Sequence, residues 1–135
     1  MTALSGIHHL GLTVTNVERS ARWYRDVLGF HEVGRVGGPA DLSRKIYLRH
    51  EGFGAHLGLV AHRGAGWFRF DETMPGLDHL SFAVADRAEL ERWCRRLFER
   101  GVAYSPIADA RSLPGAVVVA FRDPDHIRLQ LFADA

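Results

Sequence analysis

Residues 9–28 read HLGLTVTNVERSARWYRDVL, and residues 79–98 read HLSFAVADRAELERWCRRLF. The two stretches align without a gap at an offset of 70, and six of the twenty pairs are identical. The identical pairs are His9/His79, Leu10/Leu80, Val14/Val84, Arg22/Arg92, Trp23/Trp93 and Arg25/Arg95. At an offset of 72, LGLVA at 57–61 also matches LQLFA at 129–133. The chain is therefore predicted to contain two related modules.

Each copy starts with the period-2 alternation of a strand and continues with the spacing of an amphipathic helix. Asn16 and Asp86 are suited to cap the two helices, and Gly29 and Gly101 are suited to end them. The first module is predicted to hold strands at 7–14, 30–36, 45–51 and 55–61 and a helix at 17–28. The second is predicted to hold strands at 78–85, 102–105, 116–122 and 127–133 and a helix at 87–100.

This order predicts an α+β fold of two tandem β-α-β-β-β modules that form a cup-shaped open barrel. We expect one domain over 1–135, with module one at about 5–62, a linker at about 63–77 and module two at about 78–135. Each half is too small to bury its sheet alone. The linker contains the apolar residues Trp67, Phe68 and Phe70. It could pack on the flank of the barrel, or it could form a lid or a surface that binds a partner.

The composition excludes several classes of protein. The 17 basic and 16 acidic residues give a net charge of +1, so neither nucleic acid nor a membrane surface is expected as a partner. The single cysteine, Cys94, rules out an internal disulfide. No signal peptide or membrane span is expected, and a cytoplasmic location is predicted. Eight histidines are the unusual feature, because imidazole binds metals and transfers protons near neutral pH.

Alternate residues of a strand point to opposite faces, which predicts the residues of a groove. Leu10, Leu12 and Val14 should pack on the helix, so the residues between them face the other way. One histidine in each lead strand and several small residues leave space there for a ligand. The predicted groove residues are His9, Thr13, His56, Gly58 and His62 in module one, and His79, Ser81, Gln130 and Phe132 in module two.

The motifs together resemble the vicinal oxygen chelate superfamily, which contains glyoxalases, bleomycin resistance proteins and extradiol dioxygenases. The resemblance rests on HLGLTV at 9–14, WYRDVLGF at 23–30, HLSFAV at 79–84, and FRDPD at 121–125 followed by LQL at 129–131. It covers nearly the whole chain. It implies the fold and a small-molecule substrate or ligand, and it implies a homodimer, since small members usually pair.

The resemblance also implies a divalent metal, which can be Fe, Mn, Ni, Co or Zn. The family positions correspond to His9, Gly58, His79 and Gln130, of which the predicted metal ligands are His9, His79 and Gln130. Gly58 has no donor atom, and Gln130 stands where the family usually has glutamate. An amide is a neutral donor and cannot act as a base. Glyoxalase I chemistry is therefore disfavoured, and His56 and His62 are the candidate catalytic residues.

Three functions follow from these residues. The first is a metal enzyme that chelates the vicinal oxygens of a small substrate for isomerase, lyase or dioxygenase chemistry. The second is a metal-free protein that binds a drug or natural product, which the donor-free Gly58 and the amide of Gln130 favour. The third is an accessory domain with a vestigial site.

Overall fold

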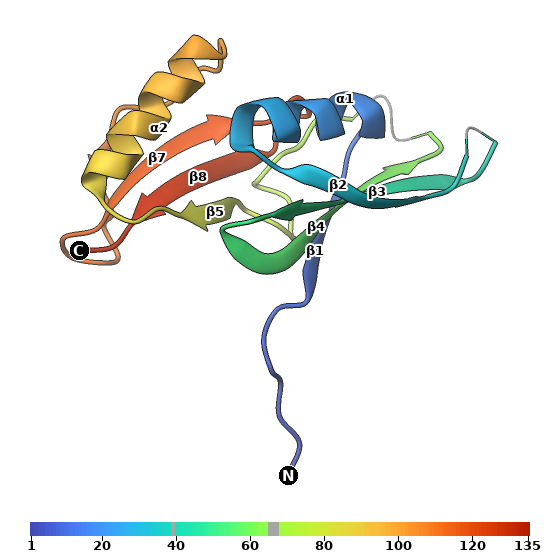
Figure 1. The fold of residues 1–135 in the computed structure, drawn as a ribbon, viewed down its shortest axis with the longest axis horizontal. Coiled ribbons are helices and arrows are strands. Elements are labelled where there is room, and N and C mark those ends of the chain that lie inside the picture. Colours follow the sequence, from blue (N-terminus) through green and yellow to red (C-terminus); the bar gives the residue numbers. More distant parts are fainter. Residues whose placement is uncertain (39, 65–67) are drawn as a thin grey trace. The chain divides into compact units, whose positions relative to one another are not determined.

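The structure is a computed structural model that describes residues 1–38, 40–64 and 68–135. It divides into two compact units, Met1–Phe68 and Arg69–Ala135. Each unit contains one four-stranded sheet and one main helix (Figure 1). The predicted α+β class and the two β-α-β-β-β modules are confirmed. Trp67, which the sequence placed in an apolar linker, lies outside the described residues.

Unit 1 contains a mixed sheet in the order β1-β4-β3-β2, in which β1 runs parallel to β4. The helix α1 is followed directly by a π-helical turn, η1. The side chain of Asn16 caps α1, and Gly29 ends η1 with a φ of 84°. The elements of this unit are β1 (His9–Thr13), α1 (Val17–Trp23), η1 (Tyr24–Leu28), β2 (His31–Val36), β3 (Ser43–His50) and β4 (Phe53–His62).

Unit 2 repeats this topology, with the sheet order β5-β8-β7-β6 and a parallel pair between β5 and β8. Asp86 caps the helix α2 by accepting a hydrogen bond from the backbone N–H of Glu89 at 2.8 Å. Cys94 is buried in this helix, as its apolar neighbours predict. The elements are β5 (Leu80–Ala83), α2 (Arg87–Glu99), β6 (Ala108–Asp109), β7 (Val117–Arg122) and β8 (Arg128–Ala133).

One predicted strand is wrong. Residues 102–105 form only an isolated bridge, Tyr104 with Phe121, and the strand β6 comes later. The hydroxyl of Ser105 accepts the N–H of Ala120 at 2.9 Å, and Pro106 has no N–H to donate to a ladder. The N–H of Ala120 therefore bonds to the side chain of Ser105, whereas in a continuing strand it would bond to a backbone carbonyl.

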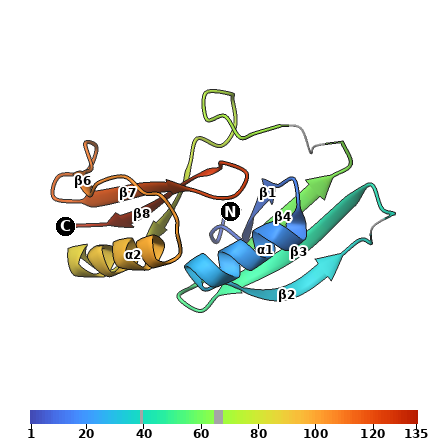
Figure 2. The ribbon, with the colours of Figure 1, turned by 90° about the horizontal axis from the view of Figure 1, so that it is seen from above.

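The apolar core of each unit lies between its sheet and its helix. In unit 1, α1 packs against one face of the sheet and contacts β3 and β4, and in unit 2, α2 contacts β7 and β8 (Figure 2). Leu12, Leu59 and Tyr24 are buried on this side of unit 1, and Leu97 and Leu129 are buried in unit 2. Because strands alternate, the other face of each sheet is left for polar and small residues.

Candidate functional site

The sheet face of unit 1 opposite α1 carries the residues that the alternation predicts. Along β1, His9, Gly11 and Thr13 are exposed, whereas Leu12 is buried. The parallel register places His9 beside His56, Gly11 beside Gly58, and Thr13 beside Val60. His9 of β1 and His56 of β4 are therefore neighbours on the same face of the sheet.

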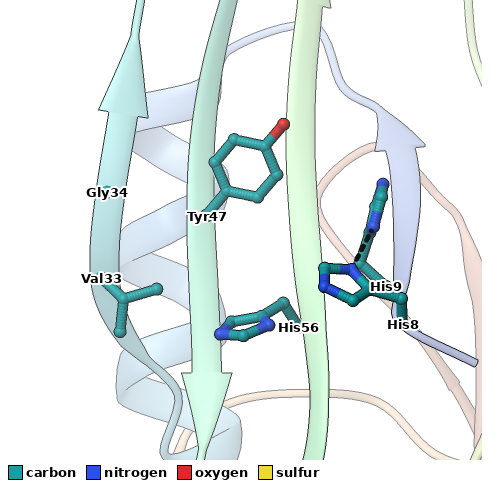
Figure 3. A pocket seen from close by; sticks show the side chains of 6 residues that line it. All are labelled: His8, His9, Val33, Gly34, Tyr47 and His56. Carbon is teal, nitrogen blue, oxygen red and sulfur yellow. Dashed lines mark hydrogen bonds between the residues drawn. The ribbon is translucent and has the colours of Figure 1, made fainter.

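A hollow of about 380 Å³ lies on this face. It is lined by His8, His9, Val33, Gly34, Tyr47 and His56 (Figure 3). Three of the six are histidines, and β1, β2, β3 and β4 all contribute. The volume is at the lower end of the range for small-molecule sites.

Tyr47 is a residue of this hollow that the sequence analysis did not single out. It pairs with Gly58 on one side and with Gly34 on the other, and Gly58 pairs in turn with Gly11. A Cβ atom added to Gly58 would lie 3.3 Å from Cε1 and 3.6 Å from Cδ1 of Tyr47. The Cδ1–Cε1 edge of the tyrosine ring therefore lies beside Gly58, and the ring extends from β3 toward β4 (Figure 3).

The histidines of the hollow are held by contacts near the start of β1. His8 Nδ1 and His9 Nδ1 are 2.9 Å apart, so one of them donates and the other accepts. The backbone N–H of His56 donates to the carbonyl of His8 at 3.3 Å. Alternation alone would turn His8 toward the helix, but His8 precedes β1 and lines the hollow instead. His62 is exposed at the end of β4, away from the residues that line this hollow.

Unit 2 orients its two predicted metal ligands through neighbouring side chains. His79 Nδ1 lies 2.6 Å from Asp78 Oδ1, and the hydroxyl of Ser81 donates to Gln130 Oε1 at 2.8 Å. Ser81 and Gln130 are register partners on β5 and β8. Since Nδ1–H of His79 donates to a carboxylate, Nε2 presents its lone pair, which is the tautomer that a metal requires.

Each unit, taken by itself, offers side chains that suit a divalent metal in part. The imidazole of His79 and the amide oxygen of Gln130 are good donors, and His9 offers Nε2 because Nδ1 is engaged by His8. Gly58 does not fit, since it has no donor and the ring of Tyr47 fills the space beside it. Among the described residues, no group of three or more His, Cys, Asp or Glu side chains is arranged to hold a metal ion.

Residues 69–72 are attached to the β7–β8 turn of unit 2. Arg122 donates to both carboxylate oxygens of Glu72, at 2.7 and 3.0 Å, which lowers the pKa of Glu72 to about 2. Arg69 and His126 Nδ1 are 2.8 Å apart, and desolvation, together with Arg69 and Arg122, lowers the pKa of His126. The backbone N–H of Phe70 donates to the carbonyl of Asp125. These contacts fix residues 69–72 of the apolar linker within unit 2.

Ser81 and Phe132, which were predicted to line a pocket, lie on the sheet face of unit 2 opposite α2. Phe132 pairs with Ala83 and is half-buried, and Ser81 is exposed. Thr13 lies on the corresponding face of unit 1 but does not line the hollow. That these three residues contact a ligand remains a prediction.

The sequence profile of the Glyoxalase/Bleomycin resistance protein/Dioxygenase superfamily matches residues 6–131. The chain belongs to this superfamily. The solved structure of a glyoxylase/bleomycin resistance protein/dioxygenase domain from Frankia sp. EAN1pec is 38% identical, with a TM-score of 0.87 over 98% of this chain and 94% of that one. Of the described residues, no helix is long and apolar enough to cross a membrane.

Two other members of the superfamily are similar to the chain. Catechol-2,3-dioxygenase from Bacillus subtilis is 27% identical over 99% of this chain, which spans only 44% of that protein. The fosfomycin resistance protein FosX from Listeria monocytogenes, solved with Mn(II) and sulfate, is 17% identical with a TM-score of 0.73 over 98% of this chain and 95% of that one. The likeness to FosX, at this level of identity, shows the shared fold alone.

Proposed function

We propose that this protein is a divalent-metal-dependent member of its superfamily that binds a small substrate through two neighbouring oxygen atoms. The observation that carries the proposal is the pair of oriented donors in unit 2. Asp78 fixes the tautomer of His79, and Ser81 fixes the amide oxygen of Gln130. Side chains that hold a metal ligand in this way contribute to affinity in known sites, where losing one typically costs about 10- to 100-fold. His9, the repeat equivalent of His79, is also proposed as a metal ligand.

The proposed ligands are all uncharged, and this property indicates the kind of substrate. Imidazole and amide donors leave the full charge of a divalent ion uncompensated, whereas a glutamate at position 130 would reduce it. A metal bound by such donors acts as a Lewis acid toward substrate oxygens. We therefore propose an anionic or readily ionised substrate, such as an enediolate, a catecholate or a hydroxamate.

A proton-transfer step in this protein needs a base other than Gln130, because an amide cannot accept a proton at neutral pH. His56 is the better candidate, since it is half-buried in the hollow beside His9. His62 is exposed at the strand end, which suits contact with solvent or with a bound substrate's edge. We propose that the imidazole of His56 accepts the proton as the general base, and that His62 contributes less to this step.

The proposed assembly is a homodimer in the cytoplasm. Both sheets have open edge strands, β1 and β2 in one and β5 and β6 in the other, and pairing with a second copy is one way to cover such edges. Light scattering at micromolar concentration checks this proposal. A mass near twice 15.1 kDa is expected, and a monomeric mass would contradict it.

Acetohydroxamic acid tests the main proposal, because it carries two vicinal oxygens and no aromatic ring. We expect calorimetry to detect its binding to protein loaded with Ni(II) or Zn(II), and no binding in the presence of EDTA. His79→Ala should abolish the binding. His31→Ala removes an exposed histidine of β2 that is not a proposed ligand, and it should leave binding unchanged. Equal binding by His79→Ala and the wild type would refute the proposal.

A second candidate function is metal-free binding of a small molecule. The observation that favours it is at Gly58, where the position that would supply a metal ligand instead accommodates the ring of Tyr47. Binding of a ligand in the presence of EDTA separates this candidate from the first.

A further inference from the structure

We propose that the hollow of unit 1 binds a planar aromatic ligand that stacks on the ring of Tyr47. The inference rests on the proposed function only in taking this sheet face as the ligand site, and it adds the class of ligand. It does not require a metal. It assigns Tyr47 as a residue that determines specificity, and Gly58 as the residue that positions it.

The first step of the argument is the orientation of the tyrosine ring. A side chain in the middle of a sheet normally stands among neighbours on the adjacent strands. Tyr47 instead has glycine as its partner on both sides, Gly34 and Gly58. The ring can therefore extend toward β4, where its Cε1 atom lies 3.3 Å from the place where a Cβ of residue 58 would be. Figure 3 shows the ring face-on between β3 and β4, so a flat face of the ring is presented on the side of the sheet where the hollow lies.

The second step is the space beside the ring. A Cβ atom added to Gly34, or to Gly11 at the far side of the same row, would meet no atom within 4 Å. The flat floor is therefore continued on both sides by bare backbone. Tyr47 is half-buried and lines the hollow, so part of its ring is accessible to a ligand. Such a floor matches the flat face of an aromatic molecule better than the contour of an aliphatic one.

The third step concerns the edges of the floor. His9 stands nearly upright to the tyrosine ring, with an interplanar angle of 79° and ring centroids 6.4 Å apart. In Figure 3, His8 lies beside His9 at β1 and Val33 lies at β2, with the ring of His56 between them. Imidazole nitrogens can donate or accept hydrogen bonds, so they suit a hydroxyl group at one edge of the ligand. The ligand class is a planar, partly apolar ring system with a polar group on one edge.

The experiment uses 2-naphthol, a planar aromatic alcohol without vicinal oxygens, and the full-length protein in EDTA. We expect saturable binding by fluorescence titration. Tyr47→Phe keeps the ring and should keep affinity within about threefold, whereas Tyr47→Leu keeps apolar bulk without the ring and should lose about tenfold or more. Phe98→Leu, which replaces an aromatic residue 75% exposed on α2, is the matched control and should bind as the wild type does.

Two results would overturn the inference. One is equal affinity of Tyr47→Leu and the wild type for 2-naphthol, with circular dichroism showing that both are folded. The other is equally tight binding of decahydro-2-naphthol, which has the same hydroxyl but no planar ring. Because the titration is done without metal, a failure of the metal proposal leaves this result unaffected, and acetohydroxamate binding is likewise independent of Tyr47.

Discussion

Replacing Gly58 by alanine should affect the stability of the sheet and the affinity of the hollow differently. The affinity is proposed to depend on the aromatic floor, which is the ring of Tyr47 together with the glycine backbone beside it. Glycine within a strand is destabilising by about 0.5–1 kcal/mol relative to alanine, because it loses more backbone freedom on folding. The new Cβ would lie 3.3 Å from Cε1 of Tyr47, closer than the 3.5–4.0 Å at which carbon atoms attract one another best. Turning the ring aside by about 30° costs about 0.5–1.5 kcal/mol. The two effects nearly cancel, so the free energy of unfolding should change by less than about 1 kcal/mol.

The affinity for 2-naphthol should nevertheless fall, by about threefold to tenfold, because a tilted ring no longer offers a flat face. Urea unfolding measures the first quantity and fluorescence titration in EDTA measures the second. Gly54→Ala is the control, since its added Cβ would also meet nothing within 4 Å and Gly54 does not line the hollow, so it should leave affinity unchanged. If Gly58→Ala bound 2-naphthol as tightly as Gly54→Ala did, the reasoning about the floor would be refuted.

Three further predictions concern the β7–β8 turn. Asp123→Ala should lower the free energy of unfolding in urea by about 2–4 kcal/mol, because the buried Oδ1 atom of Asp123 accepts two backbone N–H groups at 2.9 Å, whereas Asp123→Asn should cost less. The pKa of Glu72 is lowered to about 2, so its contribution to stability is present above pH 4.5 and is lost as the pH falls toward 2; Glu72→Gln should show less acid dependence in thermal melts over that range. His126 is the one described non-glycine residue with positive φ, 69°, so His126→Gly should raise the stability to urea by about 0.5–1 kcal/mol, and a loss would show that its contact with Arg69 matters more.

The sheet faces could be predicted from the sequence because strand periodicity leaves only two choices. Leu10 and Leu12 fix the helix side of β1, and His9 and Thr13 must then face the other way. Because His79 is the repeat equivalent of His9, the same argument predicts that it faces away from α2. Element boundaries, by contrast, were shifted where a side chain replaced a backbone bond, as Ser105 does.

The role of Tyr47 could not be predicted, although one signal was present. The buried residues Ile46 and Leu48 on either side of it indicate that it faces away from the helix. Its position over Gly58 depends on the register between β3 and β4, which includes an irregularity between Leu48 and His50. Register across a hairpin is set by the turn and by such bulges, so the pattern of a single strand does not contain it.

The two hydrogen-bonded pairs of unit 2, Asp78 with His79 and Ser81 with Gln130, could not be predicted from the sequence either. Asp78 precedes His79 in the chain, but adjacent residues of an extended chain point to opposite sides, and the 2.6 Å contact depends on the conformation before β5. Ser81 and Gln130 are 49 residues apart, and only the parallel pairing of β5 with β8 brings them together.

The most direct test of the proposed metal dependence is the metal content of the protein by mass spectrometry. The protein would be reconstituted separately with Fe(II), Mn(II), Ni(II), Co(II) and Zn(II), beside a His9→Ala/His79→Ala double variant. We predict that the wild type retains one of these metals in stoichiometric amount and that the double variant does not. If the wild type retains none of the five, or if the double variant retains as much as the wild type, the assignment of these histidines as metal ligands is wrong.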